Sequence, residues 1–133
     1  MRCPVSSSCM VKVRLEAPDS ARTAIPVEFR LIVTNDLPAP VDLYLRGREP
    51  TMDVEVARPN GEVVWRRLDG SLIPAVLQLY TLPPGAHLYV AATWDLQVGG
   101  KPVSAGEYVV HAHLLGDDSP LRAPARRLAI VAS

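Results

Sequence analysis

The chain has 133 residues, enough for one domain whose core needs no disulfide or metal ion to support it. Its 14 lysine and arginine residues equal its 14 aspartate and glutamate residues, so no net charge draws it to nucleic acid or to an anionic membrane surface. Its 13 prolines and 8 glycines indicate many turns, which disfavours a helical fold.

The first nine residues, MRCPVSSSC, precede every strand-like pattern, and we expect them to form a disordered tail. Cys3 and Cys9 both lie in this tail at a spacing that fits no metal site, so we expect free thiols. Met10 stands directly before the first alternating run, which leaves Met1 and Met10 as alternative translation starts. The chain has no signal-peptide pattern and no run of about 18 apolar residues, so we expect a cytoplasmic protein without a membrane span.

The rest of the chain, residues 10–133, consists of short runs in which apolar and polar residues alternate with a period of two, the pattern of half-buried strands. One run, residues 75–82, also fits a single helical turn, but we favour a strand. We therefore expect a single all-β domain, an immunoglobulin-like antiparallel β-sandwich of about eight or nine strands. The expected strands span residues 11–15, 26–35, 41–46, 52–58, 63–67, 75–82, 86–94, 107–115 and 125–131.

Turn residues separate these runs. Asn60-Gly61 and Gly99-Gly100 are typical of hairpins, and Pro83-Pro84-Gly85 predicts a tight turn between two strands. Tyr108 begins a strand after a glycine corner, which is the place of the tyrosine corner in sandwich domains.

Trp65 and Trp94 each lie in a predicted strand. Tryptophan is enriched where proteins bind partners, but both residues alternate with polar neighbours, so packing in the core is the favoured explanation. The pair Arg66-Arg67 is too short for a nucleic-acid site, and we expect both side chains to be solvated.

His111 and His113 are two residues apart on a predicted strand and therefore share a face, opposite the apolar residues of that strand. If His87 approached from a neighbouring strand, the three could bind zinc or copper. A solvated sheet face also accommodates histidines and is the favoured explanation, so we predict no metal ion and no other cofactor.

The serines carry no sign of catalysis. Ser71, Ser104 and Ser119 lie in predicted turns without the strand-to-helix elbow that a nucleophilic serine needs. Glycines occur singly or in hairpin pairs rather than as a phosphate-binding cluster before a helix. We therefore do not expect an enzyme.

Several short motifs, taken in order, resemble the BsuPI family, the intracellular proteinase inhibitors of bacteria. Two positions depart from the family pattern, because Met52 and the stretch Leu72-Ile73-Pro74 stand where the family usually has aromatic residues. Both changes keep apolar character. The resemblance covers about residues 25–115 and rests on Val33-x-Asn35, Gly47, Asp53-Val54, Val64-Trp65-Arg66, Leu82-Pro83-Pro84-Gly85, Trp94-Asp95 and Val103-x-x-Gly106-x-Tyr108-x-Val110.

The resemblance implies an inhibitor that binds an intracellular, subtilisin-like serine proteinase through a loop between strands. Three loops end in proline, which reduces the entropy lost on docking: residues 46–50, 67–74 and 97–102. Of the three, the middle loop is favoured because Leu72 and Ile73 can fill an apolar pocket, although packing of both side chains into the core is the favoured explanation for these two residues. The residues predicted to contact the partner are Leu68, Asp69, Gly70, Ser71, Leu72 and Ile73.

Fold alone permits another function, since sandwich domains also serve as structural or protein-interaction modules without inhibiting anything. Exposed edge strands permit dimerisation by strand addition, so we expect a monomer or a weak homodimer.

Overall fold

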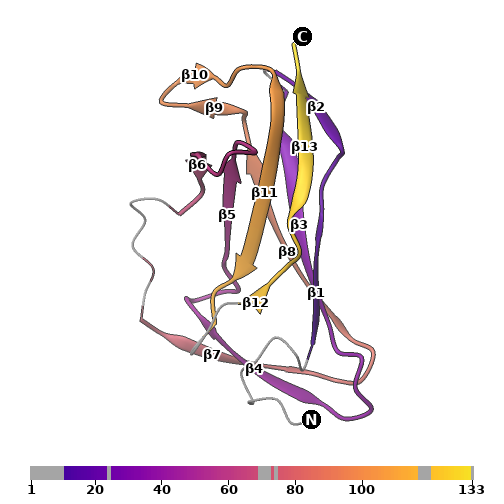
Figure 1. Ribbon diagram of the computed structural model, residues 1–133. Coiled ribbons are helices and arrows are strands. Elements are labelled where there is room, and N and C mark those ends of the chain that lie inside the picture. Colours follow the sequence, from indigo (N-terminus) through magenta and orange to yellow (C-terminus); the bar gives the residue numbers. More distant parts are fainter. Residues whose placement is uncertain (1–10, 24, 69–72, 74, 117–120, 133) are drawn as a thin grey trace.

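The computed structural model describes residues 11–23, 25–68, 73, 75–116 and 121–132, and this part of the chain folds as strands without a helix (Figure 1). The tail expected over residues 1–9, with both cysteines, lies outside the described residues. The strands are β1 (Lys12–Glu16), β2 (Ser20–Arg22), β3 (Val27–Thr34), β4 (Val41–Arg46), β5 (Met52–Ala57), β6 (Val63–Arg66), β7 (Leu77–Leu82), β8 (His87–Trp94), β9 (Gln97–Val98), β10 (Lys101–Pro102), β11 (Gly106–Leu114), β12 (Leu121–Arg122) and β13 (Arg126–Val131).

The strands form two main sheets that face each other. One sheet has the order β1-β3-β8, and the other has the order β2-β13-β11-β5-β6 with β12 also paired to β11. Strands β4 and β7 form a separate antiparallel pair that crosses one end of the molecule, and β9 and β10 form a hairpin. Among the described strands, the pairing of β2 with β13 is parallel and the others are antiparallel. The expected immunoglobulin-like β-sandwich is confirmed.

The core lies between the two sheets and is built from the alternating apolar residues of the long strands. In β11, for example, the apolar residues predicted to face inward are buried while His111 on the other face is exposed. The most deeply buried large side chains include Phe29, Leu31, Leu45, Met52, Trp94, Leu96, Tyr108, Leu114 and Leu128.

All nine expected strands form, with ends that differ from the expected ones by a few residues. The ambiguous run at residues 75–82 is strand β7. The additional strands β2, β9, β10 and β12 have only two or three residues each, too few for a period of two to be recognised.

The predicted turns also form. The Ala86 backbone N–H donates to the Pro83 carbonyl at 3.0 Å, and Gly85 has a φ of 78°, as the third position of a type II turn requires. Gly99 and Gly100, both with positive φ, connect β9 to β10.

Tyr108 forms the predicted tyrosine corner. Its ring is buried, and its hydroxyl donates to the Ser104 carbonyl at 2.6 Å. The bond ties the start of β11 to the chain that enters it.

Candidate functional site

The segment predicted to contact a partner, Leu68–Ile73, follows directly after β6. Of its residues the structure describes Leu68 and Ile73, while Asp69, Gly70, Ser71 and Leu72 lie outside the described residues. The candidate site is therefore defined by the side chains that contact Leu68 and Ile73.

Asp53 on β5 holds the first end. This carboxylate is only 3% exposed, and its two oxygens accept from different donors. The Arg66 Nε donates to Oδ2 at 2.9 Å, and the Leu68 backbone N–H donates to Oδ1 at 3.1 Å. A buried carboxylate thus fixes both the end of β6 and the first residue of the segment.

Arg67 adds a second set of bonds at the same place. Its Nη1 donates to the Met52 carbonyl at 2.8 Å, and its backbone N–H donates to the Val54 carbonyl at 2.9 Å. Both arginines are exposed, as expected, and each also donates to an acceptor on β5, because β6 pairs with that strand.

Ile73 marks the other end of the segment and is partly buried. Its Cγ2 atom lies 3.7 Å from the position that a Cβ on Gly47 would occupy, and the Gly47 N–H donates to the Val76 carbonyl at 2.9 Å. Gly47 has a φ of 98° and leads into the loop 46–50. Two of the three candidate loops are therefore neighbours.

A hollow of about 310 Å³ lies beside these loops. The Glu49–Met52 segment and Arg67 form one side of it, and the β8 residues Tyr89–Ala91 form the other. The third candidate loop, residues 97–102, instead lines a groove with Val63–Arg67 of the β6 segment.

The two tryptophans form a stacked pair across the edges of the main sheets. Trp65 on β6 and Trp94 on β8 have ring centroids 5.0 Å apart and planes inclined by 16°. Trp94 is buried and its Nε1 donates to the Gln97 carbonyl at 3.1 Å, while Trp65 is partly buried against the core. Both rings are framework residues, as expected.

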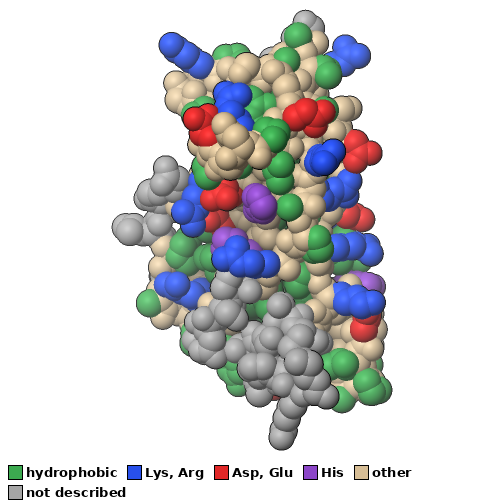
Figure 2. All heavy atoms as spheres, in the orientation of Figure 1, with side chains coloured by type: hydrophobic (Ala, Val, Ile, Leu, Met, Phe, Trp, Pro, Cys, Tyr) green, Lys and Arg blue, Asp and Glu red, His purple; other side chains and the backbone are tan. Residues whose placement is uncertain are grey.

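The three histidines do not come together. His111 and His113 lie on the outer face of β11, where Figure 2 shows histidine side chains among acidic and basic ones. His87 belongs to β8 in the other sheet, and its Nδ1 lies 2.8 Å from the Thr34 hydroxyl. The approach of His87 from a neighbouring strand is thus wrong, and no group of three or more histidine, cysteine or acidic residues in the described part can hold a metal ion.

His113 pairs in register with Asp53 on one side and Arg122 on the other. Burial lowers the pKa of His113, and the positive charges of Arg122 and Arg66 act in the same direction. The carboxylates of Asp53 and Glu55 oppose this shift without cancelling it. The neutral imidazole is the form that the fold favours.

Asn35 is a buried polar residue that the motif Val33-x-Asn35 contains. Its Nδ2 donates to the carbonyls of Ala39 and Leu82 at 2.9 and 2.8 Å, and its Oδ1 accepts from the Leu37 N–H at 2.9 Å. Its backbone also exchanges hydrogen bonds with Gly85 and Ala86. This residue therefore joins the end of β3 to the turn between β7 and β8.

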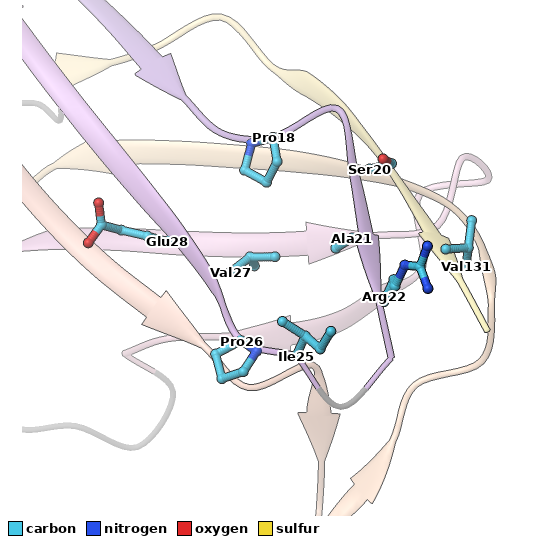
Figure 3. A pocket seen from close by; sticks show the side chains of 9 residues that line it. All are labelled: Pro18, Ser20, Ala21, Arg22, Ile25, Pro26, Val27, Glu28 and Val131. Carbon is cyan, nitrogen blue, oxygen red and sulfur yellow. The ribbon is translucent and has the colours of Figure 1, made fainter. Parts of the chain in front are cut away.

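Another hollow, of about 510 Å³, lies at the ends of β2 and β13, away from β6. Figure 3 shows its lining, in which Arg22 and Glu28 are the charged residues and Ile25 and Val131 are half exposed.

Sequence reasoning missed Asp53 as an anchor. The sequence did contain a signal. Asp53 lies in the strand before the predicted Asn60-Gly61 hairpin, and Arg66 and Arg67 lie in the strand after it. The hydrogen bonds of that hairpin form as expected, with the Arg58 N–H donating to the Glu62 carbonyl at 2.8 Å.

Two facing, mainly antiparallel sheets, a tyrosine corner and a stacked tryptophan pair define an immunoglobulin-like sandwich domain. The model of the BsuPI family, described as intracellular proteinase inhibitor, matches residues 11–119, and the chain belongs to this family. No curated protein sequence matches the chain. Membership of an inhibitor family is consistent with a protein that is not an enzyme.

Solved structures share the fold at low sequence identity. The alkylpurine DNA glycosylase AlkC of Pseudomonas fluorescens, bound to DNA, aligns with a TM-score of 0.51 at 15% identity over 92% of this chain and 31% of that chain. A β-glucosidase of Listeria innocua aligns with a TM-score of 0.50 at 8% identity over 92% of this chain and 16% of the enzyme. A CARDB domain of Pyrococcus furiosus with di-metal ions gives a TM-score of 0.48 at 16% identity over 91% and 87%.

The chain thus spans about a third or less of the glycosylase and the glucosidase, and those likenesses concern the fold alone. In the described part of the chain there is no helix long and apolar enough to cross a membrane.

Proposed function

We propose that this protein inhibits a subtilisin-like serine proteinase in the cytoplasm by inserting the segment Leu68–Ile73 into the enzyme's cleft. The observation that carries the proposal is the buried Asp53 carboxylate, which holds the Leu68 N–H and the Arg66 side chain. Membership of the BsuPI family supports a proteinase as the partner.

Anchored ends favour inhibition for a physical reason. An inhibitory loop must fit a cleft as a substrate does, and it binds tightly only if little conformational entropy is lost on docking. The bonds to Asp53 constrain the segment at Leu68, and the proximity of Ile73 to Gly47 constrains it at the other end.

The apolar residue that we propose for the enzyme's specificity pocket is Leu72. Ile73 is partly buried beside Gly47 and so serves better as an anchor than as a contact. Of the two roles considered from the sequence, Leu72 thus takes contact with the partner, and Ile73 takes packing against the sandwich.

A stoichiometric inhibition assay against subtilisin-like proteinases tests the proposal. Wild-type protein should abolish cleavage of a peptide substrate near a one-to-one ratio, and Leu72→Asp should raise the inhibition constant by about tenfold or more, because an apolar pocket rejects a carboxylate. Lys101→Ala, in the β9–β10 hairpin, is the matched control and should inhibit like wild type.

Full cleavage in the presence of excess wild-type protein would remove the inhibitor function. The alternative would then be a non-inhibitory interaction domain. Equal inhibition by wild type and Leu72→Asp, with loss of inhibition in Lys101→Ala, would move the contact to the β9–β10 hairpin.

A further inference from the structure

The outer face of the β4–β7 pair carries an apolar stripe, defined here as Tyr44, Leu77 and Leu79. In β4 the residues alternate strictly between buried and exposed, and in β7 Leu77 and Leu79 alternate with partly buried neighbours. Tyr44 lies opposite Leu79 in the strand register. These side chains are 41%, 47% and 54% exposed, so packing across the strands leaves about half of each in water.

The stripe differs from the outer faces of β1 and β3, although Tyr89 on the neighbouring β8 is 57% exposed. There the outward side chains of β1 and β3 are mostly charged and form ion pairs, such as Arg14 with Glu16 and Arg30 with Glu28. Contiguous apolar side chains on an outer sheet face indicate contact with another protein surface.

The ends of the stripe carry opposite charges. Arg46 lies opposite Leu77 at one end, and Asp42 lies opposite Thr81 at the other. Asp42 accepts a hydrogen bond from the Thr81 hydroxyl at 2.7 Å, and in the described part of the chain neither Asp42 nor Arg46 belongs to an ion pair. The order along β4 is therefore negative, aromatic, positive.

We propose that this face binds a second copy of the chain. A two-fold axis that lies in the interface, perpendicular to the strands and passing beside Tyr44, reverses the direction of the partner's β4. Tyr44 then meets Tyr44 of the partner subunit, and Arg46 meets Asp42 of the partner subunit. Symmetry makes the charge pair occur twice, which is the self-complementarity that an isologous dimer requires.

The contact is small, because it involves the outer face of two six-residue strands. Interfaces of this size support weak, reversible association, so we expect a micromolar to millimolar dissociation constant. This mode packs sheet faces together, as two sheets pack in a sandwich, and uses no strand addition.

Charge exchange tests the proposal by sedimentation equilibrium in a reducing buffer, which excludes disulfides through Cys3 and Cys9. Wild type should dimerise reversibly, whereas Arg46→Asp alone and Asp42→Arg alone should each weaken the dimer by about tenfold or more through like-charge contacts. An equimolar mixture of the two variants should form heterodimers of wild-type affinity, and the double variant should dimerise again. Restoration of this kind also shows that the variants are folded.

Two further variants test the stripe itself. Leu79→Asp should abolish the dimer, while Val98→Asp, at a similarly exposed apolar residue in the β9–β10 hairpin, should leave it unchanged. A chain beginning at Met10 should dimerise like the full chain.

Three results would overturn the proposal. If the wild-type protein stays monomeric at millimolar concentration, the stripe does not bind a second copy of the chain and would instead contact a different protein. Single charge variants that dimerise like wild type, or a mixture that does not, would exclude the two-fold arrangement. Loss of the dimer in the chain beginning at Met10 would assign the interaction to the preceding residues.

Discussion

Asp53 is the residue that links the framework to the proposed function. Asp53→Asn keeps the shape of the side chain but removes the charge that two donors share, so the free energy of unfolding should fall by about 2 kcal/mol. Urea unfolding measures this change. The same variant should inhibit a proteinase less well than wild type, because the Leu68 end of the segment loses its charged acceptor.

The control for Asp53 is Asp36, which pairs with Lys12 at 2.9 Å on the exposed surface. Asp36→Asn should change stability by less than about 1 kcal/mol, since exposed ion pairs contribute little. Equal effects at both positions would contradict the role of Asp53 as an anchor.

We expect the free energy of unfolding to depend on pH through His113. Its pKa in the folded protein lies below the ordinary value of 6.5, so the unfolded chain binds more protons as the pH falls through this range. The free energy of unfolding should therefore be fully retained above pH 6.5 and decrease as the pH falls toward the lowered pKa. Urea unfolding at a series of pH values from about 5 to about 8 measures the slope.

His113→Gln should flatten this slope, because the titrating group is gone. His111→Gln, at the exposed histidine on the same outer face, is the matched control for the loss of an imidazole. A wild-type slope in His113→Gln would mean that another group controls the pH dependence.

At the scale of elements, Asn35 ties the end of β3 to the β7–β8 turn through its side-chain amide. Asn35→Ala removes three hydrogen bonds and leaves the Leu82 carbonyl without this buried partner, so the free energy of unfolding should fall by about 3 kcal/mol. Thermal and urea unfolding measure the loss. Asn60→Ala, which removes an exposed bond to the Glu62 N–H, should lower stability by no more than about 1 kcal/mol.

The strands could be predicted because alternation is a local property of the sequence. The Asn60-Gly61, Pro83–Gly85 and Gly99-Gly100 turns could be predicted for the same reason, since each depends on residues next to one another. Which strands pair is not local. The separation of His87 from His111 follows from β8 and β11 belonging to different sheets, and no pattern within either strand contains that information.

The candidate site likewise combines features that depend on neighbouring residues with features that depend on which strands pair. The family motifs contain Asp53, Asn35 and both tryptophans, and packing of the tryptophans in the core was expected, yet the sequence did not reveal that Asp53 is buried and bonded to Leu68. That bond depends on how β5 pairs with β6, where the register shifts between Val56 and Ala57. An irregular register is set by packing of the whole sandwich.

For the whole molecule, the stacked tryptophans connect the free edges of the two main sheets, since Trp65 lies on β6 and Trp94 on β8. If this contact helps to hold the sheets together, the two rings are energetically coupled.

The free energies of unfolding lost in Trp65→Ala and in Trp94→Ala should then sum to more than the loss in the double variant, by about 1 kcal/mol for the ring contact. Urea unfolding of the four proteins gives the coupling energy. Far-ultraviolet circular dichroism adds an independent signal, because Trp65→Phe should abolish the exciton couplet that two stacked indoles produce there while keeping an aromatic ring in place. Additive losses together with an unchanged spectrum would show that each ring packs against its own sheet and that the sandwich is closed by its aliphatic core alone.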